Sequence, residues 1–327
     1  MMPIRPKTWS PIAVLVLVML APITAQAMTT FNRIVVFGGS LSDSGNAFAL
    51  TGFANRPPYD QLDPFLIPSG PYSIGGNHFS NGATWIEQFA KGLDLGGSVG
   101  PAFASSSLEA TDYAVGGARA REDGLNVNMP EQVGTFLKDF NNVAPFDALY
   151  VIDFGGNDVR DALDEALRQG NPNLIISDAL NSIASNMRLL YDHGARKFLV
   201  LNVADIGTIP SILMADKSFS GIAAVATQLS VGFDLALNPT IALYFQDVSD
   251  EQIADFDVFT TVDTVIAAVI ANPGAFGMTN ADTACIEPDD APFRCDTPEQ
   301  YLFWDGIHPT KAGHAILAQK AAEVLGK

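Results

Sequence analysis

Basic residues are scarce in this chain of 327 amino acids. Lys and Arg number 18 against 36 Asp and Glu, which gives a formal net charge of −18. Nucleic-acid binding needs basic patches, so no nucleic-acid partner is expected. The same deficit argues against charge-driven docking on anionic lipid. Hydrophobic residues make up 48% of the chain, which is enough for one large folded domain rather than a disordered chain.

Cysteine and histidine are also sparse, with two Cys and four His. Cys285 and Cys295 lie in a segment rich in Pro and Asp. A zinc site is not expected there, because no His lies between them and the spacing does not fit. The pair would form a disulfide in an exported chain and remain two thiols in a reducing compartment. We predict the disulfide.

Long apolar runs are missing except near the N-terminus. Two basic residues precede an apolar run over residues 11–23, and residues 25–27 read Ala-Gln-Ala. This order is the layout of a secretory signal peptide, although an uncleaved signal anchor has similar features. The run is shorter than the roughly 20 residues of a membrane span. We predict a signal peptide over residues 1–27, and a secreted or periplasmic single domain over residues 28–327 without an integral membrane span.

Apolar runs and helical segments alternate along the rest of the chain. Runs rich in β-branched and aromatic residues predict strands at 33–38, 112–115, 148–154, 197–203 and 255–260. Helices are predicted at 83–91, 131–140, 177–192, 220–245, 263–271 and 310–325. Ser177 is expected to cap the third helix, and Pro239 to break or kink the fourth. This alternation indicates an α/β fold whose parallel sheet is covered on both faces and binds ligands beyond the strands' carboxyl ends.

Three blocks at the ends of expected strands contain residues suited to catalysis. In residues 37–46 (FGGSLSDSGN), Ser40 lies at an expected strand-to-helix turn. It is either a nucleophile close to backbone N–H donors or the cap of the following helix. Residues 112–118 (DYAVGGA) allow close backbone approach to a ligand or form an ordinary tight turn. In residues 155–158 (GGND), Asn157 offers an N–H to an oxyanion or caps the next helix.

A fourth block, residues 304–310 (WDGIHPT), brings a carboxylate and an imidazole together. Asp305 and His308 are three apart on one turn, where a hydrogen bond would fix the imidazole tautomer and raise its basicity. The alternative is a surface histidine in a turn. Such a setting is missing around the other three histidines, His78, His193 and His314.

Together, the four blocks present Ser, Gly, Asn and His in this order, and the sequence resembles the GDSL, or SGNH, lipase/esterase family. Residues 78–82 (HFSNG) are similar to the family's FSNG segment, and residues 272–280 (NPGAFGMTN) to its NP-x-x-YGFTN segment. The resemblance covers about residues 31–327. It is closest to the long branch with plant GDSL enzymes and bacterial secreted or outer-membrane esterases.

The resemblance implies a flavodoxin-like three-layer α/β/α fold and hydrolysis of carboxylic esters through an acyl-enzyme. At the matching positions, Ser40 would be the nucleophile, His308 the general base and Asp305 its orienting carboxylate. The Ser40 N–H, the Gly117 N–H and the Asn157 side chain would form the oxyanion hole. The family chemistry needs no metal or organic cofactor, and the substrate would be a small-molecule or lipid ester.

One position departs from the family motif, because Gly39 stands where the family has Asp. That Asp is not the triad acid, so hydrolysis remains possible. Glycine nevertheless adds backbone freedom to the turn carrying Ser40. The alternative function is therefore a catalytically weak or inactive esterase-like binding protein. The retained Ser40, Asn157, Asp305 and His308 favour the enzyme.

The substrate is not defined by these residues. A carboxylesterase, a phospholipase, an acyltransferase and a carbohydrate deacetylase are all compatible with them, and the oligomeric state is open. The acidic composition favours neutral esters over anionic polymers. Residues 48–82, rich in Phe and Gly, form either an apolar acyl pocket or ordinary packed loops.

Overall fold

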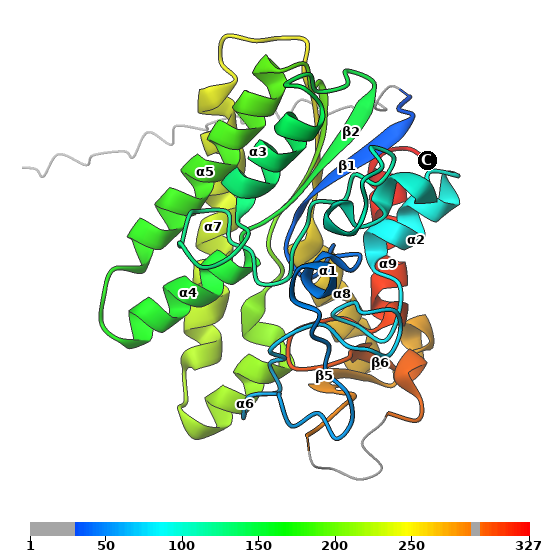
Figure 1. Cartoon of the computed structure of the whole chain (residues 1–327). Coiled ribbons are helices and arrows are strands. Elements are labelled where there is room, and N and C mark those ends of the chain that lie inside the picture. Colours follow the sequence, from blue (N-terminus) through cyan, green and yellow to red (C-terminus); the bar gives the residue numbers. More distant parts are fainter. Residues whose placement is uncertain (1–29, 289–294) are drawn as a thin grey trace, which may run out of the picture.

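A parallel sheet runs through the centre of the molecule (Figure 1). The computed structural model describes residues 30–288 and 295–327, so the signal peptide predicted at residues 1–27 lies outside the described residues. The strand order is β1 (Arg33–Gly38), β2 (Ala148–Asp153), β3 (Lys197–Leu201) and β4 (Gln252–Phe256). Nearly all residues of β1, β2 and β3 are buried, as expected for parallel strands covered on both faces.

Helices form a layer on each face of this sheet (Figure 1). One layer contains α3 (Met129–Asp139), α4 (Gly156–Leu167), α5 (Pro172–Asp192) and α7 (Ile222–Tyr244). The other contains α2 (Trp85–Gly92), α8 (Val258–Ala271) and α9 (Lys311–Val324). The predicted three-layer α/β/α fold is therefore confirmed. Among residues 30–288 and 295–327, no helix has the length and apolar character needed to cross a bilayer.

Shorter elements fill the connections. They are the helices α1 (Asn46–Thr51) and α6 (Pro210–Ser218), the 3₁₀ turns η1 (Gly96–Val99), η2 (Ala102–Ala104), η3 (Ile206–Thr208), η4 (Ala275–Gly277) and η5 (Pro298–Gln300), and the strands β5 (Asn280–Ala284) and β6 (Tyr301–Phe303). β5 and β6 pair in parallel as a small second sheet. Figure 1 shows this sheet and α6 at the lower end of the view, next to the long loops that descend from α1.

The strand predicted at residues 255–260 is wrong in its position. The strand β4 ends at Phe256, and α8 starts two residues later, ahead of the helix start predicted at residue 263. Asp257 sets this boundary, because its side chain accepts a hydrogen bond from the Thr260 N–H at 2.9 Å. The β-branched residues that follow suggested a strand, but they occupy the first turns of the helix.

The predicted start of the helix over residues 177–192 is also wrong. The helix α5 begins at Pro172, and Asn171 caps it by accepting the Asn173 N–H at 3.2 Å. Proline suits the first helical position because it has no N–H to leave unpaired. Ser177 lies inside the helix rather than at its cap. In α7, the helix continues through Pro239 without a break.

The segment predicted as a strand at residues 112–115 is not a regular strand, but it extends the sheet beyond β1. The Tyr113 N–H donates to the Val36 carbonyl at 2.8 Å, and the Val115 N–H donates to the Gly38 carbonyl at 3.1 Å. The segment stays short because the chain turns at the two glycines directly after it. Those glycines therefore lie beside the end of β1.

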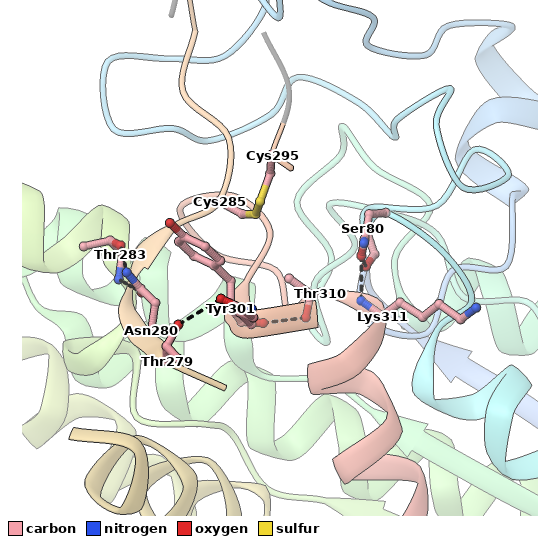
Figure 2. The surroundings of a disulfide bond; sticks show 11 residues. Ser80, Thr279, Asn280, Thr283, Cys285, Cys295, Tyr301, Thr310 and Lys311 are labelled. Atoms are coloured by element: carbon pink, nitrogen blue, oxygen red, sulfur yellow. Dashed lines mark hydrogen bonds between the residues drawn. A yellow bond between two sulfur atoms is a disulfide. The ribbon is translucent and has the colours of Figure 1, made fainter. Parts of the chain in front are cut away.

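A disulfide closes the loop between β5 and β6. Cys285 is bonded to Cys295, so the predicted disulfide is confirmed (Figure 2). Next to it, the Ile286 N–H donates to the Trp304 carbonyl at 3.0 Å, which continues the pairing of the small sheet. The disulfide-bonded segment thus supports the chain immediately before the predicted acid–histidine block.

Candidate active site

Ser40 and His308 meet although they lie far apart in the sequence. Ser40 is on the turn directly after β1, and His308 is in the loop between β6 and α9. The Ser40 Oγ is 2.7 Å from the His308 Nε2. His308 is only 4% exposed, and the Phe79 ring packs against it with the ring centroids 5.3 Å apart. A serine hydroxyl bonded to an imidazole in this way can transfer its proton to the ring.

Asp305 completes a chain of hydrogen bonds with this histidine. Its Oδ2 is 2.8 Å from the His308 Nδ1. The other oxygen, Oδ1, accepts the N–H groups of Ile307 at 2.8 Å and His308 at 2.7 Å. The Tyr72 hydroxyl donates to Oδ2 at 2.9 Å. These donors satisfy a fully buried carboxylate and fix its position beside the ring it orients.

The turn that carries Ser40 is held by backbone hydrogen bonds on both sides of Gly39. The Gly39 N–H donates to the Asp153 carbonyl at 3.3 Å, and the Gly39 carbonyl accepts the N–H groups of Ser42 and Asp43 at 3.2 and 3.1 Å. The Ser42 hydroxyl is itself committed, since it donates to the Asp153 Oδ2 at 2.6 Å. Ser40 is thus the hydroxyl of this turn that is bonded to the imidazole.

Three N–H groups in and around the Ser40 turn are candidates for binding an oxyanion. The backbone N–H groups of Ser40 and Gly117 have no hydrogen-bond partner among the residues that the structure describes. The Asn157 side chain donates one Nδ2 hydrogen to the Ala118 carbonyl at 2.9 Å and keeps a second one. A Cβ on Gly39 would lie 3.5 Å from this Nδ2, so the amide sits beside the nucleophile turn. The Asn157 amide therefore lies beside the Ser40 turn, and the backbone N–H groups of Ser40 and Gly117 are left available to a ligand.

Asp43 ties the Ser40 turn to the glycine loop, a role that the sequence reasoning missed. Its Oδ2 accepts the Gly116 N–H at 2.8 Å, and its Oδ1 accepts the Asn46 N–H at 2.6 Å. Burial raises the pKa of Asp43, although these N–H groups work in the opposite direction. Because Asp43 occupies the Gly116 N–H, the N–H left for a ligand is that of Gly117, whose φ of 84° suits glycine.

Asn157 is placed by the sharp start of α4. Gly155 has a φ of 117°, and a Cβ there would lie 2.5 Å from Phe233 and 2.6 Å from Val203, so no larger residue fits. One helical turn further on, the Arg160 Nη1 donates to the Asn157 Oδ1 at 3.4 Å. This contact turns the amide so that its Nδ2 faces the Ser40 side.

A cavity of about 100 Å³ opens next to Ser40. Its polar lining residues are Ser40, Asp153, Asn157, Arg160 and Asn202, and the rest of its lining is largely apolar. The lining comes from the segments after β1, β2 and β3, from the start of α8 and from Ile307, and includes none of residues 48–82. Residues 48–82 therefore do not line this cavity, and whether they form an acyl pocket or ordinary packed loops is not decided by it.

A known family covers nearly all of the described chain, since the model for the GDSL-like lipase/acylhydrolase family matches residues 34–321. The chain belongs to this family. A GDSL esterase/lipase of Arabidopsis thaliana is 25% identical over 96% of this chain and 93% of its own length. Thermolabile hemolysin of Vibrio parahaemolyticus is 24% identical over 89% of this chain and 63% of its own length.

Among solved structures, a putative GDSL-like lipase from Parabacteroides merdae aligns with a TM-score of 0.44 at 13% identity, over 92% of this chain and 99% of its own. The GDSL family consists of esterases and lipases. Membership therefore supports a hydrolase that acts on ester bonds.

The other three histidines of this GDSL-family protein make contacts within the fold and none with Ser40. His314 lies on α9, as predicted, where its Nδ1 accepts the Trp85 N–H at 3.2 Å, and burial lowers its pKa to about 3. His78 lies 3.1 Å from Glu87; burial opposes its charge, but the carboxylate raises its pKa. His193 caps α5. Within the described ranges, no group of three or more His, Cys, Asp or Glu is placed to hold a metal ion.

A half-buried aspartate near the site predicts a fall in stability with rising pH. Burial, supported by the charges of Asp257 and Asp205, raises the pKa of Asp234 to about 7, although its carboxylate accepts the Val203 N–H at 3.0 Å. Between about pH 4 and 7 the folded state therefore holds a proton that the unfolded state loses, so this group costs stability as the pH rises through that window.

The variant Asp234→Asn should remove this cost, because its amide oxygen can still accept the Val203 N–H and cannot ionise. We expect its melting temperature to exceed that of the wild type clearly at about pH 8 and little at about pH 5. Thermal unfolding of both proteins at the two pH values measures this. An equal difference at both values would show that Asp234 keeps an ordinary pKa.

Proposed function

We propose that this protein is an exported serine ester hydrolase that cleaves carboxylic esters through an acyl-enzyme. The observation that carries the proposal is the chain of hydrogen bonds from Ser40 through His308 to Asp305, with distances of 2.7 and 2.8 Å. Family membership supports ester hydrolysis, and this geometry supports the route. Each group stands within the range at which a nucleophile and its base exchange a proton.

In this mechanism, the Ser40 Oγ attacks the ester carbonyl while its proton moves to the His308 Nε2. Asp305 accepts the Nδ1–H and stabilises the imidazolium that forms. The negative charge on the carbonyl oxygen is met by the N–H groups of Ser40, Gly117 and Asn157. Collapse releases the alcohol, which takes the proton from His308. A water molecule then repeats these steps on the acyl-enzyme and frees the acid.

The alternative, an inactive binding protein, rests on Gly39. The Gly39 backbone makes three hydrogen bonds to backbone groups of Asp153, Ser42 and Asp43, so the turn does not depend on a side chain at this position. The nucleophile and the base are retained and bonded to each other, and the residues proposed as oxyanion donors are retained as well. These contacts favour catalysis over binding alone.

Hydrolysis of p-nitrophenyl esters by the purified protein tests the proposal, together with labelling by a serine-directed phosphonate. We expect turnover and a single adduct, located on Ser40 by peptide mass mapping. A phosphonate requires an activated nucleophile, so it separates a working site from a folded but inactive one. Absence of both turnover and label would favour the binding protein.

The variant Asn157→Ala is expected to fold normally and to lower kcat by about 10²–10³, which is typical for loss of one oxyanion donor. Arg160→Gln is a useful comparison, because it removes the contact to the Asn157 amide and alters the cavity wall but keeps the amide itself, so it should cost less. Steady-state kinetics and melting temperatures of the three proteins measure this. An unchanged kcat in Asn157→Ala would leave Asn157 a structural residue of α4.

Export is part of this proposal and rests on the N-terminal sequence. A basic start, the apolar run at residues 11–23 and small residues at 25–27 predict cleavage after Ala27. The disulfide between Cys285 and Cys295 suits an oxidising compartment. Intact-mass analysis of protein recovered from the periplasm or the medium should find a chain that starts at Met28. A mass that includes residues 1–27 would contradict cleavage.

A further inference from the structure

Two cavities lie side by side behind Ser40. The first is the active-site cavity of about 100 Å³, and the second, of about 50 Å³, lies between α8, β6 and α9. Val262, Val265, Leu302 and Leu317 are among its lining residues, and all four are at most 8% exposed. Thr261 is its one polar side chain among the residues that the structure describes. The second cavity is therefore an almost entirely apolar space.

One apolar wall separates the two cavities. The residues that line both are Leu41, Ala204, Ile209, Val258 and Ile307. Leu41 directly follows Ser40, and Ile307 directly precedes His308. The wall is thus fixed to the nucleophile and the base themselves, and whatever is bonded to Ser40 lies against it.

The two parts of an ester have different needs at such a site. The alcohol must leave when the acyl-enzyme forms, so it requires a path to solvent. The acyl chain stays bonded to Ser40 and can occupy a closed space. The polar wall with Arg160 and Asn202 suits the departing alcohol, whereas the apolar wall suits the chain, since buried methylene groups gain free energy from leaving water.

From this arrangement we infer that the acyl chain of the substrate lies along Leu41 and Ile307, and that Val258 limits its length. The substrate class is then a neutral ester of a short, unbranched fatty acid, with the chain ending at the wall. The second cavity is the space that a longer chain would enter if the wall were opened. This inference rests on the proposed ester hydrolysis at Ser40.

The test is the dependence of kcat/KM on acyl length, using p-nitrophenyl acetate, butyrate, hexanoate, octanoate and dodecanoate. The wild type should gain up to about fourfold per methylene group between the short esters and then fall at octanoate and beyond. The variant Val258→Ala should raise the octanoate-to-butyrate ratio by about tenfold, because it joins the two cavities. Adding Val265→Phe, which fills the second cavity, should cancel that gain.

Val269→Ala is the matched control. Val269 is also a buried valine of α8, but it lines neither cavity, so its replacement should leave the octanoate-to-butyrate ratio unchanged. Melting temperatures identify any variant that is merely destabilised. If Val258→Ala is destabilised, Val258→Thr replaces it in the test, because threonine has nearly the same volume as valine. Its hydroxyl group would lie in the apolar wall, so it should lower the octanoate-to-butyrate ratio. Equal ratios in the wild type, Val258→Ala and Val258→Thr would overturn the inference, as would a wild type that prefers dodecanoate to butyrate.

The experiment distinguishes a wrong placement of the acyl chain from failure of the proposed ester hydrolysis. If acetate is cleaved and Ser40 is labelled while the ratios do not move, only the placement of the acyl chain is wrong. If no ester is cleaved and no phosphonate adduct forms, the hydrolase itself is contradicted, and the cavities lose their assigned occupant.

Discussion

Replacing Ser40 with alanine is expected to abolish ester cleavage and phosphonate labelling together. Alanine has no oxygen to attack the carbonyl, and the committed Ser42 hydroxyl, bonded to the Asp153 carboxylate at 2.6 Å, cannot take its place. We expect a loss in kcat of at least about 10⁴-fold. The Ser40 side chain is partly exposed and its Oγ bonds to His308, so the fold should survive with a similar melting temperature.

Ser44→Ala is the control for this variant. Ser44 lies on the same loop but is buried, and its backbone N–H, which the substitution keeps, donates to Asp112 at 3.1 Å. It should retain both turnover and the adduct on Ser40. An adduct on Ser42 or Ser44 in the wild type would instead place the nucleophile elsewhere on this loop. Residual cleavage by Ser40→Ala at a rate near that of the wild type would falsify the proposed mechanism.

The sequence allowed the site residues to be predicted where they directly follow the end of a strand. Ser40 and Asn157 follow buried strands that are easily recognised, and parallel strands bring their carboxyl ends to one edge of a sheet. Asp305 and His308 are three residues apart, so their contact is local. Their approach to Ser40 is not local, and it was expected only through the resemblance to the family.

The supporting residues could not be predicted in this way. Tyr72 lies in a long loop without periodicity, and nothing in its neighbours indicates that its hydroxyl reaches Asp305. Asp43 was visible within the nucleophile block, but its bond to Gly116 depends on where the glycine loop lies in space. Such partners are chosen by tertiary packing, which sequence patterns do not record.

Errors in the predicted elements have related causes. Val258 to Val262 are mostly β-branched residues, which favour strands on average, yet Asp257 caps them as a helix. The helices α4 and α6 and the strands β5 and β6 are short or have mixed patterns, and no element was predicted for them. The cavity could not be predicted either, because its apolar lining residues cannot be told from ordinary core residues in the sequence. Residues 48–82, rich in Phe and Gly, were the more visible candidate in the sequence, but they do not line this cavity.

Replacing His308 with alanine should lower kcat by about 10⁴–10⁶, nearly as much as the loss of Ser40. No other imidazole is placed to accept the Ser40 proton, since His314 bonds to the Trp85 N–H and His78 pairs with Glu87. Asp305→Ala should cost roughly one to two orders of magnitude less, because Asp305 orients the base and does not itself react. The double variant of Ser40 and His308 should be little worse than either single one, because the two residues act as a unit.

The pH dependence separates this role from a structural one. In the wild type, the rate should fall on the acid side as the imidazole gains a proton and can no longer accept one from Ser40. In His308→Ala the residual rate should lose that acid limb, while the melting temperature stays close to the wild-type value. Profiles of kcat/KM against pH for p-nitrophenyl butyrate measure this. If the acid limb persists without His308, another group takes the proton. The candidate is then Asp153, the carboxylate among the described lining residues of the cavity, whose pKa is raised by burial to about 6.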